Sequence, residues 1–92
     1  MDSASVQRLR DGVNAIPIGS DISSVARQLG PPDWDKTVNK NRFIRFFIYY
    51  VTRRRAESAV ESDKRVELTF DKSGKLTSVY SNVEGIATRN WP

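Results

Sequence analysis

Apolar residues recur at helical spacing in the first part of the chain, before Pro17. They share one side of a predicted helix: Val6, Leu9, Val13 and Ile16. Gly12 interrupts this pattern, and because glycine weakens a helix by about 1 kcal/mol relative to alanine, we expect the helix to fray or stop there. Pro17 ends any helix by Ile16, because the residue before a proline is held out of the helical region.

A second helix is predicted between Ile18 and Pro32. Its apolar face is formed by residues three or four apart: Ile22, Val25, Ala26 and Leu29. Ser20 or Asp21 can cap the first turn, Gly30 can adopt the left-handed conformation that closes a helix, and the following prolines prevent continuation. A helix of about eight residues is unstable alone in water, so we expect it to dock on the rest of the domain.

Residues 43–52 are dense in aromatic and β-branched side chains and predict a strand with two apolar faces. The even face holds Ile44, Phe46, Ile48 and Tyr50. The odd face holds Phe43, Arg45, Phe47, Tyr49 and Val51. A small sheet has too little core alone, so we expect the helices to cover the even face and the odd face to point outward.

Residues 65–70 and 75–81 predict an antiparallel hairpin, closed by a turn with Gly74 at a left-handed position. The pairs expected across this turn are Phe70 with Leu76, Leu68 with Ser78, and Val66 with Tyr80. This register puts the apolar residues of both strands on one face. We interpret residues 33–42 as a polar connector and residues 53–64 as a charged segment, either a mobile loop or a frayed turn of helix. The tail from residue 82 has little pattern.

Two helices followed by three strands predict an α+β domain, with both short N-terminal helices packed on a three-stranded antiparallel β-meander. Ninety-two residues make one domain, residues 1–92. We expect its core at about residues 18–82, between flexible N- and C-terminal segments.

The composition argues against catalysis. The chain has no cysteine and no histidine, so thiol chemistry, disulfides and the commonest general base are excluded. We therefore expect no enzyme, no catalytic residue, no cofactor and no metal. A formal net charge of +4 favours anionic surfaces without choosing among lipid, nucleic acid and acidic protein. No signal peptide is visible after Met1, and no apolar run is long enough to span a membrane.

Several punctuation residues resemble those of the BamE family of small bacterial outer-membrane lipoproteins, also called SmpA/OmlA. The positions that carry the resemblance are Gly19, Val25, Leu29, Gly30 and Pro32, followed by an aromatic strand that ends in arginine and a glycine turn at Gly74. The resemblance covers roughly Ile18 to Asn82. These matching residues are expected to have structural roles.

The resemblance implies a non-enzymatic adaptor of the cell envelope, with an ααβββ fold, that binds protein partners and anionic lipid. Its relatives act in outer-membrane β-barrel assembly or in envelope integrity. The chain departs from the family in lacking the signal peptide and the lipidated cysteine. We expect it at the periplasmic face of the outer membrane if a signal peptide has been removed, and in the cytoplasm otherwise.

The odd face of the first strand is the candidate partner-binding surface: Phe43, Arg45, Phe47, Tyr49 and Val51. An exposed aromatic stripe rimmed by arginine suits a protein interface. The alternatives are cover by the C-terminal tail and pairing with a second copy. A basic run is the candidate site for anionic lipid or an acidic partner: Arg53, Arg54 and Arg55. The alternative is a solvated loop charge.

Two other functions stay open from the sequence. An inhibitor or immunity-type protein would block an enzyme with the face of its sheet. A cytosolic nucleic-acid-binding domain is the minor alternative, since aromatic and basic residues alternate here. The basic residues at the two ends of the first strand form no continuous stripe, which disfavours nucleic acid.

Overall fold

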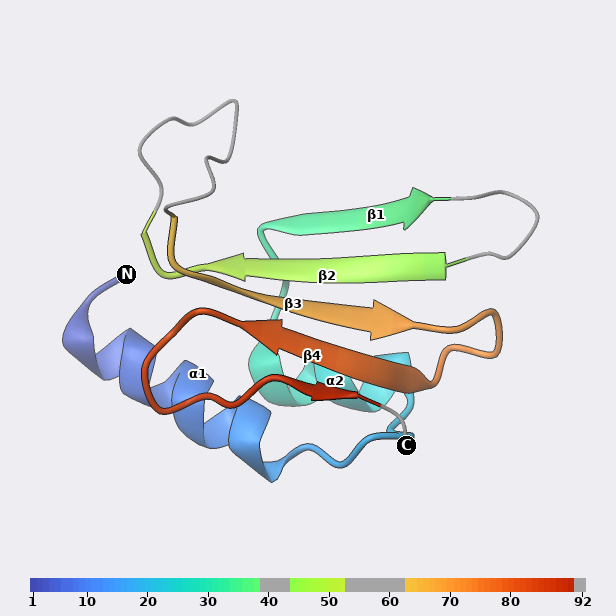
Figure 1. Ribbon diagram of the computed structural model, residues 1–92, viewed down its shortest axis with the longest axis horizontal. Coiled ribbons are helices and arrows are strands. Elements are labelled where there is room, and N and C mark those ends of the chain that lie inside the picture. Colours follow the sequence, from blue (N-terminus) through green and yellow to red (C-terminus); the bar gives the residue numbers. More distant parts are fainter. Residues whose placement is uncertain (39–43, 53–62, 91–92) are drawn as a thin grey trace.

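The computed structural model describes residues 1–38, 44–52 and 63–90, and in these residues two helices lie on one face of an antiparallel sheet (Figure 1). The helices are α1 (Ser3–Ala15) and α2 (Ile22–Leu29). The strands follow one another in spatial order: β1 (Trp34–Val38), β2 (Ile44–Tyr50), β3 (Arg65–Phe70), β4 (Leu76–Ser81) and β5 (Arg89–Asn90).

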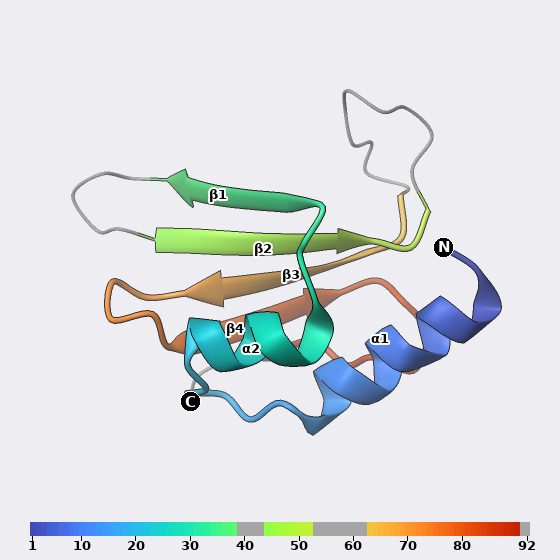
Figure 2. The ribbon, with the colours of Figure 1, turned by 180° about the vertical axis from the view of Figure 1, so that it is seen from behind.

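The predicted α+β class is confirmed, but the predicted number of three strands is wrong. The sheet of the described residues has five strands, because β1 and β5 extend the expected meander at its two edges. The expected connector at residues 33–42 contains β1, and every residue of β1 pairs with a residue of β2. Both helices lie on the same side of the sheet, as the element order predicts (Figure 2).

Helix α1 continues through Gly12 instead of stopping there. A Cβ atom built on Gly12 would lie 2.6 Å from Cδ2 of Leu29, so the glycine allows α2 to approach α1 closely. The expected apolar face is confirmed where it matters most, since Leu9, Val13 and Ile16 are buried. Close packing of the helices therefore accounts for a residue whose propensity alone predicts a break.

The expected roles of the residues that punctuate α2 are confirmed only in part. Asp21 precedes the helix but makes no side-chain cap, because its carboxylate accepts a hydrogen bond from Nζ of Lys75 at 2.7 Å. Val25 is fully buried and Leu29 packs on the edge of the core. Gly30 has φ 78° and ψ −176°, a conformation reserved for glycine although not the left-handed helix expected. Gly19 also has a positive φ, and its N–H donates to the carbonyl of Leu76 at 2.7 Å. Pro32 leads the chain from α2 into β1.

The assignment of the two faces of β2 is wrong. Phe47 and Tyr49 are each only 3% exposed and belong to the core beneath the helices. The cause is the pairing with β3, in which Phe47 lies opposite Leu68 and Tyr49 opposite Val66. Residues paired across antiparallel strands share a face, so the apolar side of β3 brings the odd side of β2 inward with it.

The hairpin of β3 and β4 keeps its expected start and loses its expected register. Phe70 pairs with Leu76 as predicted, and Gly74 has the expected positive φ of 77°. A bulge at Thr69 and Phe70 then shifts the register, so Leu68 pairs with Val79 rather than with Ser78. Val79 is thereby buried, and Tyr80 turns to the side away from the helices.

The core extends beyond residues 18–82 in both directions. On the N-terminal side it includes the buried face of α1, and on the C-terminal side it includes Val83 and Ile86. The Arg89 guanidinium donates to the carbonyls of Val13 and Ile16, each at 2.9 Å. Both carbonyls lie at the C-terminal end of α1, and that of Val13 also accepts the N–H of Ile16 at 3.2 Å, so the tail adds hydrogen bonds to the end of the first helix.

The assignment of faces predicts opposite outcomes for two adjacent phenylalanines. Phe47→Ala should lower the free energy of unfolding by about 3–5 kcal/mol, because it empties space in the core. Phe46→Ala, the matched control on the other face, should cost less than half as much. Urea unfolding followed by circular dichroism measures both. Equal losses, or a larger loss for Phe46→Ala, would mean that the even face is the core.

Candidate protein-binding surface

The side of the sheet that faces away from the helices, here called the outer face, collects aromatic, aliphatic and charged side chains. Strand pairing places these residues on it: Trp34, Lys36 and Val38 from β1; Ile44, Phe46, Ile48 and Tyr50 from β2; Arg65, Glu67 and Thr69 from β3; Ser78 and Tyr80 from β4. It is the side turned to the viewer in Figure 1.

The apolar residues of the outer face form a packed floor with an exposed rim. Ile48 and Tyr50 are only 8% and 7% exposed, although no described helix covers them. The ring of Tyr50 meets that of Trp34 edge to face, with centroids 6.4 Å apart. Val38 and Tyr80 are 42% and 41% exposed, and both lie on this face. The floor supports the surface, and the rim offers apolar area to a partner.

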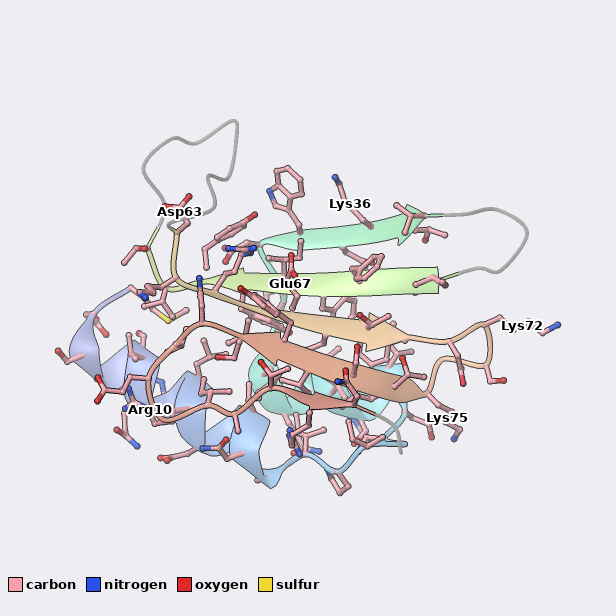
Figure 3. The ribbon with its side chains drawn as sticks, viewed as in Figure 1. Arg10, Lys36, Asp63, Glu67, Lys72 and Lys75 are labelled. Carbon is pink, nitrogen blue, oxygen red and sulfur yellow. The ribbon has the colours of Figure 1, made fainter. Side chains whose placement is uncertain are left out.

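In the described part of the chain, two cations lie over aromatic rings of the outer face. The Nζ of Lys36 is 4.4 Å from the ring centroid of Trp34, and the guanidinium of Arg65 is 5.2 Å from that of Tyr80. Both distances fall within the range of cation–π attraction. Figure 3 shows Lys36 on the outermost strand and Glu67 near the middle of the face. Lys36 therefore presents a positive charge on an aromatic background, whereas the charge of Arg65 is balanced by the neighbouring Glu67.

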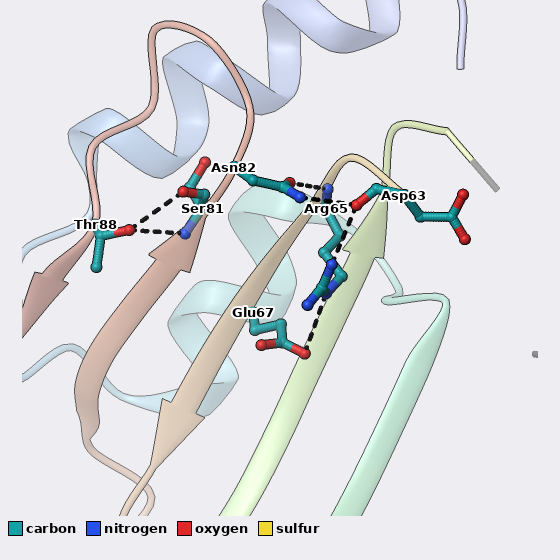
Figure 4. A network of polar contacts seen from close by, with 6 residues as sticks. All are labelled: Asp63, Arg65, Glu67, Ser81, Asn82 and Thr88. Carbon is teal, nitrogen blue, oxygen red and sulfur yellow. Dashed lines mark hydrogen bonds and ion pairs between the residues drawn. The ribbon is translucent and has the colours of Figure 1, made fainter. Parts of the chain in front are cut away.

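Arg65 is held in place by a polar network at the start of β3 (Figure 4). Its backbone N–H donates to Oδ1 of Asn82 at 2.7 Å, and the Nδ2 of Asn82 donates to the carbonyl of Asp63 at 2.9 Å. The guanidinium donates to the same carbonyl at 3.1 Å and forms an ion pair with Glu67 at 3.5 Å. The cation over Tyr80 is thus oriented by groups from two segments.

The outer edge of the sheet is fastened by carboxylates. The N–H of Tyr50 donates to Oδ2 of Asp33 at 2.7 Å, and the N–H of Asp33 donates to the carbonyl of Ile48 at 2.9 Å. On the helix side, Arg45 donates two hydrogen bonds to Asp35, at 2.6 and 2.7 Å. These bonds lower the pKa of Asp35 and raise that of Arg45. Charge on this side of β1 is therefore neutralised.

Tyr49 joins the helix layer to the sheet. Its hydroxyl donates to the carbonyl of Gly30 at 2.8 Å, just where α2 ends. Burial of the ring, with the negative charges of Asp33 and Asp35 nearby, raises the pKa of Tyr49 to about 12. The tyrosine has a structural role in this position and is not available to a partner.

The residues of the predicted partner-binding stripe do not form one exposed surface. Arg45 is exposed and paired with Asp35, Val51 packs on the edge of the core, and the other two described members are buried. Their predicted outward orientation is therefore wrong. The remaining residues of the two predicted sites lie outside the described residues: Phe43, Arg53, Arg54 and Arg55.

Sequence reasoning missed the rim of the outer face. In β1 the apolar residues Trp34 and Val38 share one face with Lys36, and polar residues lie between them. This alternation is a weak strand signal, and the high share of charged residues favours a connector instead. The alternation of β4 alone places Tyr80 on the apolar face with Val66, because the bulge that shifts the register is not visible in it. An amphipathic tyrosine next to the fully apolar Val79 was the available clue.

Among the described residues, no group of three acidic, histidine or cysteine side chains lies close enough together to hold a metal ion. A hollow of about 520 Å³ lies beside the turn of β3 and β4 and is lined in part by Asp71 and Lys75. The carboxylate of Asp71 accepts the N–H groups of Ser73 and Lys75, so it shapes the turn. Figure 3 shows Lys75 at this end of the sheet.

No helix of the described part of the chain is long and apolar enough to cross a membrane. The chain matches no protein-family model, no curated protein and no solved structure.

Tyr49 predicts a specific loss of stability in alkali. A pKa raised from 10.0 to about 12 in the folded protein means that folding favours the neutral phenol. Its contribution should be complete below pH 10 and should disappear as the pH rises towards 12. The stability of Tyr49→Phe should therefore fall less steeply with pH over this range than that of the parent. Tyr80→Phe, a control at an exposed position, should behave like the parent. Urea midpoints measured across this pH range test it, and parallel curves for Tyr49→Phe and the parent would contradict it.

Proposed function

We propose that this chain is a non-enzymatic adaptor domain of the cell envelope, similar to the BamE/SmpA/OmlA lipoproteins, that binds a protein partner through its outer face. The observation that carries the proposal is the apolar rim of that face. Val38 and Tyr80 lie exposed on a side of the sheet that no described helix covers, while the core is complete on the opposite side. Exposed apolar area of this kind is typical of protein interaction sites.

The envelope assignment rests on the resemblance and on the roles of its residues. Val25 is fully buried, and Gly19 and Gly30 have positive φ angles, as expected of residues that mark a fold. Outer-membrane β-barrel assembly and envelope integrity are the two processes that the resemblance supports. Anionic lipid is the second ligand that we propose, because the chain carries a formal net charge of +4.

Two alternatives use the same face. An inhibitor would bind an enzyme through the outer face, and the packed floor of Ile48 and Tyr50 suits such a contact equally well. Single-stranded nucleic acid would stack bases on Trp34 and Tyr80. Each of these rings already has a cation over it, so stacking a base there requires Lys36 or Arg65 to move aside. This disfavours nucleic acid as the ligand.

A double change on the outer face tests the proposal. Phe46→Ser with Tyr80→Ser should leave the circular dichroism spectrum and cooperative melting intact, because neither residue belongs to the core. The same variant should lose most of its capture of partner proteins from envelope extract. The matched control, Arg27→Ser with Gln28→Ser on the exposed side of α2, should capture as well as the parent.

Capture that survives the change on the outer face, with the control unaffected, would contradict the proposal. A mobility-shift assay with a single-stranded oligonucleotide separates the nucleic-acid alternative. Tight binding of the oligonucleotide that the double change abolishes would move the assignment to that class.

A further inference from the structure

We propose that the partner adds an extended strand to the free edge of β1. The incoming strand would carry an acidic side chain beside Lys36, with an apolar side chain beside Trp34 and another beside Val38. The inference rests on the proposed function, since it needs a protein partner at the outer face. It adds the geometry of binding and the chemistry of the segment that is bound.

Strand β1 is the least protected element of the sheet. It pairs with β2 on one side, and no other strand of the described residues lies beyond it. All of its residues except Trp34 are exposed. Figure 2 shows both helices in front of the part of the sheet that contains β3 and β4, with β1 beyond them. A partner can therefore reach β1 from its edge and from both faces.

The direction of the backbone groups follows from the hydrogen bonds of β2. The carbonyl of Ile48 and the N–H of Tyr50 both point towards β1, since Asp33 binds each of them. Backbone groups alternate along an antiparallel ladder, so Ile48 and its partner Trp34 face each other. The same alternation turns the N–H and C=O groups of Asp35 and Thr37 to the free edge. These groups are the donors and acceptors for an added strand.

Charge selects the acidic segment. On the helix side of β1, Asp35 is already neutralised by the bidentate bond from Arg45. On the outer face, no carboxylate of the described residues forms an ion pair with Lys36. Opposite charges on neighbouring strands attract, and an acidic residue in the added strand would place its carboxylate next to the Nζ of Lys36.

Lys36 also disfavours a second copy of the chain at this edge. The antiparallel register that uses the outward groups of both copies pairs Asp35 of each chain with Thr37 of the other. In that register Lys36 lies opposite the same lysine, and like charges directly opposite each other are destabilising. A lysine in the middle of an edge strand is a common guard against such self-pairing. The edge is thus built for a different chain.

Synthetic peptides test the proposal directly. The probe is acetylated and amidated Thr-Ile-Thr-Glu-Thr-Ile-Thr, whose apolar and acidic residues have the spacing of Trp34, Lys36 and Val38. Titration at millimolar concentration, followed by amide NMR shifts, should move the signals of Asp35 and Thr37. A peptide with lysine in place of glutamate should bind about two- to fivefold more weakly. Lys36→Glu should reverse this preference.

Three changes to the backbone, two in the protein and one in the peptide, isolate the backbone contact. Thr37→Pro should abolish binding and leave the melting temperature nearly unchanged, because proline is tolerated where the N–H of an edge strand faces solvent. Lys36→Pro should instead lower the melting temperature, because that N–H faces β2. N-methylation of alternate amides in the peptide should abolish binding to the unchanged protein, which removes any doubt about the folding of a variant.

Three results would overturn the proposal: no shift at Asp35 or Thr37 with any peptide, binding that survives both N-methylation and Thr37→Pro, or a dimer in sedimentation that Thr37→Pro dissociates. The last result would identify a second copy as the occupant. Partner capture separates this inference from the proposed function. If Thr37→Pro keeps capture and Phe46→Ser with Tyr80→Ser loses it, strand addition fails and the adaptor function stands. If neither variant affects capture, both fail.

Discussion

The orientation of β2 is the constraint on which the rest of this structure depends. Its side chains alternate between two faces that are both rich in apolar residues, and only one face can meet the helices. Pairing with β3 decides the outcome, because Phe47 lies beside Leu68 and shares its side. Tyr49 then points inward, where its hydroxyl reaches the carbonyl that follows α2. One choice of face thus sets the core and the attachment of the helices.

The same choice creates the surface on which the proposed function rests. With the odd residues inside, Ile48 and Tyr50 must lie on the outer face, where they pack with Trp34 and leave Tyr80 exposed. A sheet of this size needs only one apolar side to fold, so the second is available for recognition. The outer edge of the sheet is likewise available for recognition, because β1 is held by its pairing with β2 and by the bond between Arg45 and Asp35.

The parts that could be predicted are those with a local cause. The end of α2 follows from Gly30 and the prolines after it. The turn between β3 and β4 follows from Gly74, a glycine that adopts the expected positive φ. The face of β2 could not be predicted, because both of its periodic sets are apolar and only a neighbouring strand distinguishes them. Strand β1 could not be predicted, because a lysine lies between its two apolar residues on the same face and interrupts the alternation. The register of β4 depends on a bulge that alternation cannot reveal.

The most direct test of this account is the exposure of four aromatic rings to a soluble paramagnetic probe. A neutral gadolinium chelate broadens the NMR signals of protons that it can approach. The account predicts strong broadening for the rings of Phe46 and Tyr80, and little for those of Phe47 and Tyr49, which are 3% exposed. The reverse pattern, with the odd residues of β2 broadened and Phe46 protected, would contradict the assignment of faces and the binding surface with it.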